Sequence, residues 1–176
     1  MGPLGHCALG MAAKPAAPRV PLGVLLIAPL ALDLLAVALG LAGIEGGTKG
    51  ITWSHSLFLS AVWSALAGLI GARMFRDRRA GVVIGLLVFS HWVLDFISHP
   101  IPFSSFSWRH WHWDYGRPLP PDLPLLFANS PRVGLGLYNH ISAVEATVLE
   151  ACMFAAGAAV YVVYVVRNRR KGDGSV

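Results

Sequence analysis

Long apolar runs alternate along this chain with shorter polar, basic or aromatic segments. Four of the runs are long enough to cross a bilayer as helices, for which about 20 apolar residues suffice. They cover residues 20–43, 53–72, 81–99 and 144–166. This pattern predicts an all-α polytopic membrane protein, with residues 1–176 forming one integral membrane domain.

The segments outside these runs differ in character. Residues 3–13 are mildly apolar and stop before Pro15 and Pro18. We expect a short interfacial or re-entrant helix there, because ten or so residues cannot span a bilayer. Residues 100–143 are aromatic and rich in proline, and residues 167–176 form a basic tail. The four long runs are therefore the only predicted spans.

Composition and charge agree with this picture. The chain is 55% hydrophobic and 13% charged, which excludes an ordinary soluble domain. Its net charge of +5 would also fit a nucleic-acid-binding protein. However, with four spans, ten of the fourteen lysines and arginines fall on one side of the bilayer. The positive-inside rule makes that side cytoplasmic and places both termini there, so we expect the lipid bilayer as partner and no nucleic acid.

The third run contains three ionisable residues, His91, Asp95 and His99, at intervals of four positions. Four residues are slightly more than one helical turn, so these side chains rise along one face and drift by roughly 40° per step. An ionisable group in hydrocarbon costs at least a few kcal/mol. Three of them on one face therefore indicate a bound metal ion, a proton partner or a water-filled cavity.

Other runs place polar groups at a similar depth. Asp33 lies near the middle of the first run, His55 at the mouth of the second, and Glu150 in the first turns of the fourth. Imidazole and carboxylate groups suit Zn, Mn or Fe, and a divalent ion would compensate the buried carboxylates. A metal-bound water would then be available as a nucleophile. The two cysteines, Cys7 and Cys152, do not have the spacing of a metal-binding pair.

Two further interpretations use the same residues. They can form a proton or ion path in a small permease or transporter, which would have to form a homo-oligomer because four spans are few. They can also bond neighbouring helices to one another in a structural protein without catalysis. Asp122, which follows two prolines, fits either a site residue or a turn.

Several motifs occur in an order that resembles a known family. They are GHCALGMAAK (5–14), PLALDLL, SHSL (54–57), SHWVLDFISH (90–99), PDLPLL (121–126) and PRVGLGLYNH (131–140). Together they are similar to bacterial inner-membrane proteins labelled membrane-bound metal-dependent hydrolases, some of whose relatives are called permeases. The chain departs from the family's pattern in one place, where about twenty residues separate His99 from Asp122.

The resemblance implies a metal site composed of histidines and aspartates. Its members would be Asp33, His55, His91 and Asp95, with His99, Asp122 and His6 as further ligands. His6 reaches the others only if residues 3–13 re-enter the bilayer. We therefore expect a divalent-metal-dependent hydrolase of the bacterial inner membrane that acts on a lipid or envelope-derived substrate at the outer leaflet. His99 or Glu150 would be its general acid or base.

Overall fold

The computed structural model describes residues 1–45, 51–98, 106–107, 112–113, 123–127 and 132–173. Over these residues the helices are α1 (Pro3–Ala12), α2 (Leu22–Ile27), η1 (Ala28–Leu30), α3 (Ala31–Leu41), α4 (Thr52–His55), α5 (Leu57–Met74), α6 (Arg78–Ser98), η4 (Leu137–Asn139) and α7 (Ala143–Asp173). The strands are β1 (Phe106–Ser107), β2 (His112–Trp113), β3 (Leu123–Pro124) and β4 (Arg132–Val133).

The described chain is helical apart from two very small strand pairs. β1 pairs antiparallel with β2, Phe106 opposite Trp113, and β3 pairs antiparallel with β4, Leu123 opposite Val133. Each strand has two residues, so neither pair forms a sheet with a face of its own. The predicted all-α class therefore holds for the described residues.

Among the described residues, four helical stretches are long and apolar enough to cross a membrane. They are Leu22–Leu41, Leu57–Met74, Arg78–Ser98 and Ala143–Arg170. Each overlaps one of the four predicted runs, so the number and the approximate positions of the candidate spans are confirmed by length and composition. α7 continues to Asp173 and thus turns most of the predicted basic tail into helix.

The first candidate span is interrupted by the 3-10 turn η1. Proline lacks an amide hydrogen and its ring clashes with the preceding turn, so Pro29 interrupts the regular helix. Accordingly, α2 ends at Ile27, and α3 begins at Ala31.

The second predicted span, 53–72, is wrong as one continuous helix. The chain leaves helical geometry at Ser56, whose φ and ψ are −67° and 146°. Ser56 then caps α5, because its hydroxyl oxygen accepts a hydrogen bond from the Leu59 amide at 3.3 Å. His55 consequently ends the one-turn helix α4 and does not belong to the long helix.

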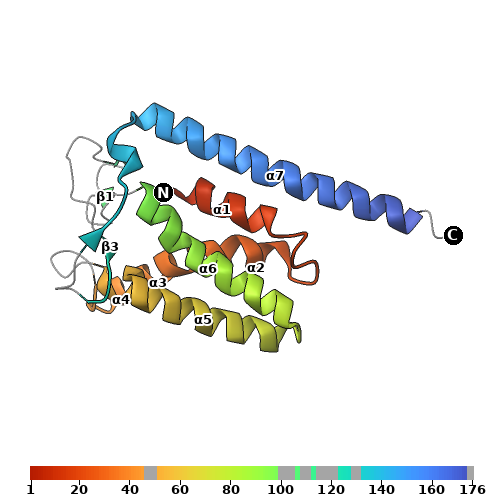
Figure 1. The fold of residues 1–176 in the computed structure, drawn as a ribbon, viewed down its shortest axis with the longest axis horizontal. Coiled ribbons are helices and arrows are strands. Elements are labelled where there is room, and N and C mark those ends of the chain that lie inside the picture. Colours follow the sequence, from red (N-terminus) through yellow and green to blue (C-terminus); the bar gives the residue numbers. More distant parts are fainter. Residues whose placement is uncertain (46–50, 99–105, 108–111, 114–122, 128–131, 174–176) are drawn as a thin grey trace.

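Small residues allow the helices to approach one another closely. A β-carbon added at Gly81 of α6 would lie 2.5 Å from the Gly68 carbonyl oxygen of α5. A β-carbon at Gly157 of α7 would collide with the carbonyl of Ala8 in α1. Figure 1 shows the resulting arrangement, in which α7 lies along α1, and α1 in turn contacts α2 and α6.

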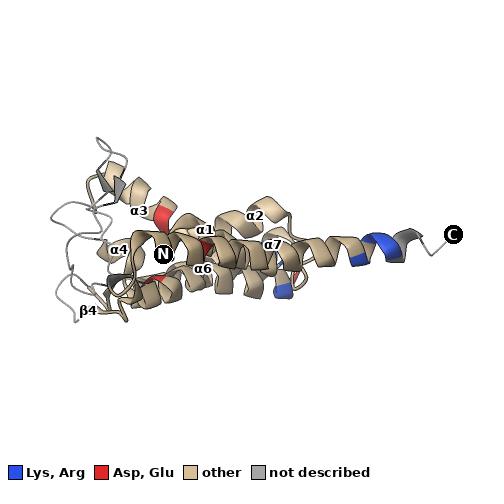
Figure 2. Cartoon of the chain, turned by 90° about the horizontal axis from the view of Figure 1, so that it is seen from above, with Lys and Arg blue, Asp and Glu red and all other residues tan. Residues whose placement is uncertain are grey.

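The interior and the exterior are both apolar. A buried core forms between η1, α3 and α6 around Leu32, Val88 and Trp92. Large apolar side chains such as Leu69 and Leu86 face outward, 57% and 63% exposed. Figure 2 shows that lysine and arginine gather toward the end of the molecule where α7 terminates. An apolar exterior with charge at one end is typical of a membrane protein.

The N-terminus does not lie at that basic end. The amino group of Met1 lies 2.8 Å from Asp95 Oδ1, near the far end of α6. The short N-terminal helix was correctly predicted, and it packs against α2, α6 and α7. The expected position of the N-terminus on the basic side is not supported.

Candidate metal centre

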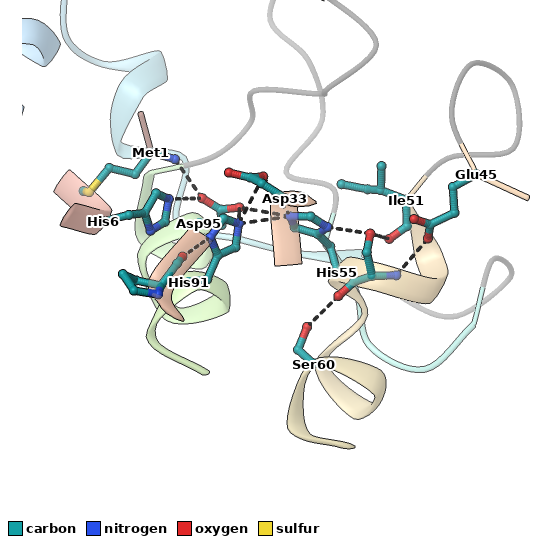
Figure 3. A network of polar contacts seen from close by, with 11 residues as sticks. Met1, His6, Asp33, Glu45, Ile51, His55, Ser60, His91 and Asp95 are labelled. Atoms are coloured by element: carbon teal, nitrogen blue, oxygen red, sulfur yellow. Dashed lines mark hydrogen bonds and ion pairs between the residues drawn. The ribbon is translucent and has the colours of Figure 1, made fainter. Parts of the chain in front are cut away.

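Two of the candidate spans and the turn α4 direct side chains into one cluster (Figure 3). Asp33 comes from α3 and His55 from the end of α4, whereas His91 and Asp95 lie one turn apart on α6. His55 Nε2 lies 3.0 Å from His91 Nε2. Asp33 Oδ1 lies 3.5 Å from the first of these nitrogens and 3.4 Å from the second. The predicted convergence of these residues is therefore present.

Asp95 completes the set from the other side. Its Oδ2 lies 3.2 Å from His91 Nε2 and 3.9 Å from His55 Nε2. A tetrahedral ion with bonds of about 2.0–2.1 Å holds its ligand atoms roughly 3.3–3.4 Å apart. The distances from each carboxylate to the two histidines and between the histidines, 3.0–3.9 Å, bracket that value. Among the described residues, Asp33, His55 and His91 form one metal-type group, and Asp95 belongs to a second one with His6 and His91. Two imidazoles and two carboxylates are also a donor set that divalent transition metals accept.

The tautomer of His91 follows from its partner. His91 Nδ1 lies 2.7 Å from the carbonyl oxygen of Pro29. A carbonyl can only accept, so the ring proton is assigned to Nδ1 and the lone pair of Nε2 faces the cluster. That carbonyl is available because the regular helix α2 ends at Ile27 and is followed directly by the 3-10 turn η1, which contains Pro29.

The same argument applies to His55. Its Nδ1 lies 2.7 Å from Ser54 Oγ, and that hydroxyl donates to the Ile51 carbonyl at 3.5 Å. Ser54 then accepts from His55 Nδ1, which leaves the lone pair on Nε2. Two bare nitrogens 3.0 Å apart repel unless a cation lies between them. In the other tautomer of His55 the proton lies on Nε2, which then donates an ordinary hydrogen bond to His91 Nε2. That tautomer requires the Ser54 hydroxyl to donate to His55 Nδ1.

An outer layer of contacts holds the turn α4 in place. Glu45 Oε1 accepts a hydrogen bond from the Ser54 amide at 2.8 Å. Ser60 Oγ donates to the Ser54 carbonyl at 3.2 Å. A one-turn helix has hardly any internal hydrogen bonds, so these outside partners stabilise it and fix the position of His55. The sequence did not indicate Glu45, because one acid in a short polar loop has no periodicity.

Three of the four side chains in the cluster are buried, and the fourth is partly exposed. His55, His91 and Asp95 are 2%, 1% and 4% exposed. The side chain of Asp33 is 37% exposed. Asp33 is therefore the member of the cluster through which water or a substrate can reach the others.

His6 brings α1 to the opposite side of Asp95. Its ring stacks on that of His91, with centroids 4.1 Å apart and planes inclined by 10°. His6 Nε2 lies 3.6 Å from Asp95 Oδ1, the oxygen that also contacts the Met1 amino group. Burial lowers the pKa of His6 below its ordinary value, which favours a neutral imidazole. The packing of α1 against η1 and α6 thus brings His6 to the cluster.

The remaining predicted residues are placed differently. Glu150 is buried on α7, and its Oε1 accepts from the Gly2 amide at 2.6 Å and from the Tyr138 hydroxyl at 2.8 Å. It links α7 to the N-terminus and to η4, and it is not part of either metal-type group found among the described residues. His99 and Asp122 lie outside the described residues.

Comparison with known proteins identifies no relative of this chain. No family model matches it, and neither does a curated protein or a solved structure. The likeness to membrane-bound metal-dependent hydrolases rests on the sequence motifs alone and stays a prediction.

Proposed function

We propose that this chain is a membrane-embedded hydrolase that depends on a divalent metal ion held by Asp33, His55, His91 and Asp95. The observation that supports the proposal most directly is the 3.0 Å approach of His55 Nε2 to His91 Nε2, with both Nδ1 atoms engaged elsewhere. Metal-ligating histidines commonly donate the N–H of their second ring nitrogen to a backbone carbonyl or another acceptor in this way.

Charge balance supports the same proposal. Asp33 and Asp95 both contact the histidine pair, and buried carboxylates need a compensating cation. Asp95 has a positive neighbour in the Met1 amino group, whereas Asp33 contacts the two histidines. A divalent ion at the shared point would neutralise both carboxylates.

The arrangement of the residues suits hydrolysis. A divalent ion bound there would supply Lewis acidity and a water of lowered pKa. The buried histidines and Asp95 exclude bulk water, while the half-exposed Asp33 marks the side from which a substrate approaches. The same carboxylate is placed to orient an incoming water or to hold its proton.

The surroundings indicate the substrate class and the location. The cluster lies among helices whose outward faces are apolar, so a lipid or an envelope-derived molecule can reach it from the bilayer. The basic end of the molecule would face the cytoplasm, which puts the cluster in the outer half of the inner membrane. The sequence motifs shared with membrane-bound metal-dependent hydrolases point to the same activity.

Metal analysis of the purified protein tests this proposal. Wild type should carry at least about one divalent ion per chain, and a His91→Ala/Asp95→Ala variant should lose it. His140→Ala is the matched control, because His140 is exposed and is not part of either metal-type group. Equal and negligible metal in wild type and the double variant would rule out the metal site.

Activity is tested separately on metal-loaded protein in lipid vesicles. Release of product from phosphate-ester or acyl-ester lipids, lost on chelation and restored by Zn, Mn or Fe, is the expected result. Proton flux that disappears in Asp95→Asn, without any hydrolysis, would favour the transporter interpretation instead.

A further inference from the structure

The metal-type side chains form two groups that do not merge into one. His6, His91 and Asp95 offer ligand atoms within 4.8 Å of one another, and so do Asp33, His55 and His91. His91 belongs to both groups, and Asp95 belongs to the group of His6.

The two oxygens of Asp95 face different groups. Oδ2 points toward His91 Nε2 at 3.2 Å and His55 Nε2 at 3.9 Å. Oδ1 points toward His6 Nε2 at 3.6 Å. A carboxylate that presents one oxygen to each side has the geometry of a bridging ligand. Centres with two metal ions typically place them about 3.5–4 Å apart, a distance that one carboxylate spans.

His6 supplies an independent observation. It is 0% exposed, and neither of its ring nitrogens has a hydrogen-bond partner among the described residues. A buried imidazole is normally satisfied at one nitrogen at least, since an unmet donor or acceptor in the interior is costly. The unpartnered Nε2 is the atom that approaches Asp95 Oδ1. A cation beside these two atoms would give His6 Nε2 the partner that it lacks.

We propose that the centre binds two divalent cations bridged by Asp95. Asp33, His55, His91 and Asp95 Oδ2 hold the first ion. His6 Nε2 and Asp95 Oδ1 hold the second, whose other positions are open to water or to an oxygen-donor substrate. This inference rests on the proposed function, since the bridging carboxylate belongs to the first site.

A competing account gives Asp95 Oδ1 a different partner. The Met1 amino group lies 2.8 Å from that oxygen and supplies a positive charge there. His6 would then serve only as a ring stacked on His91. That account predicts one metal ion per chain and no effect of the His6 nitrogens on metal content.

Metal stoichiometry and magnetic coupling separate the two accounts. Metal-free protein is titrated with Mn²⁺, bound metal is counted per chain, and the electron paramagnetic resonance spectrum is recorded. Wild type should bind about two ions and show the spectrum of a coupled pair, as expected for ions about 3.5–4 Å apart. His6→Phe keeps a ring for stacking but no nitrogen, and it should bind about one ion without coupling. His140→Ala should behave like wild type.

Each outcome decides a different point. One uncoupled ion in wild type, unchanged in His6→Phe, overturns the second site and leaves the first intact. No bound ion in wild type overturns the proposed function together with this inference. The wild-type count and spectrum decide between these outcomes even if His6→Phe does not fold.

Discussion

At the scale of single residues, Ser54 positions the candidate centre without being one of its ligands. Its amide donates to Glu45, its carbonyl accepts from Ser60, and its hydroxyl forms a hydrogen bond with His55 Nδ1. The first two contacts hold the backbone of α4, and the third sets the tautomer and the tilt of the imidazole. Ser54 thus couples the position of a ligand to the fold around it.

Ser54→Ala should therefore weaken metal binding while the helices stay intact. Loss of such an outer partner typically costs 10–100-fold in metal affinity, and we expect a loss in this range. Competition against a chromophoric chelator measures it. Ser90→Ala is the matched control: Ser90 precedes His91 as Ser54 precedes His55, but its hydroxyl bonds to the Leu87 carbonyl of its own helix. Equal losses in both variants would contradict this role of Ser54.

Only some of these residue-level relations can be predicted from the sequence. The spacing of four residues puts His91 and Asp95 on one face, and the depth of Asp33 brings it to the same level. The contact of Glu45 with Ser54 depends on how a loop closes in space, which no local pattern encodes. For the same reason, the stacking of His6 on His91 follows only from the packing of α1 against α6.

At the scale of elements, the interruptions in the helices matter as much as the helices themselves. The 3-10 turn η1 makes the Pro29 carbonyl available for His91, and the break at Ser56 ends α4 at His55. The first break has a clear sequence signal, because proline cannot continue a helix. The second lies inside an apolar run, and its signal is a capping serine that the hydrophobic pattern outweighs.

Close packing of α5 on α6 gives a prediction about stability. In Gly81→Ala the new methyl group would meet the Gly68 carbonyl 2.5 Å away and force the helices apart. The free energy of unfolding should fall by about 1–3 kcal/mol, the usual cost of overpacking. Denaturation by a strong detergent, followed by circular dichroism, measures the change.

Gly23→Ala provides the control for that experiment. Gly23 also lies in a helix, and no atom lies within 4 Å of an added β-carbon. Alanine is the better helix former by roughly 0.5–1 kcal/mol, so this variant should be no less stable than wild type. If the two variants lost the same stability, close contact between α5 and α6 would not be the cause of the effect at Gly81.

At the scale of the whole molecule, the exposed apolar surface is compatible with insertion into a bilayer, and the charge distribution predicts an orientation that can be tested. Most of the apolar part of α7 is not buried inside the structure and is available to lipid. The apolar runs were sufficient to predict the number of candidate spans among the described residues. They did not fix the depth of α1, because a short and mildly apolar segment can lie on the surface or dip inward.

Reporter fusions test the orientation. Because the basic residues of α7 and of the turn after α5 should face the cytoplasm, a fluorescent protein fused after Val176 should be bright. Alkaline phosphatase fused at the same position should be inactive, since it needs the oxidising periplasm. Neutralising the four arginines between 73 and 79 should weaken this preference. An active phosphatase fusion on the native chain would reverse the assigned orientation.

The order of the candidate ligands along the chain has a consequence for biosynthesis. His6, Asp33, His55, His91 and Asp95 all precede residue 96, whereas α7 begins at Ala143. At about 5–20 residues per second, a ribosome needs several seconds to go from the last of these ligands to the start of α7. During that interval the centre can assemble while the side of α1 that α7 later covers is still open. The proposed metal can therefore be loaded on the nascent chain before α7 packs against α1.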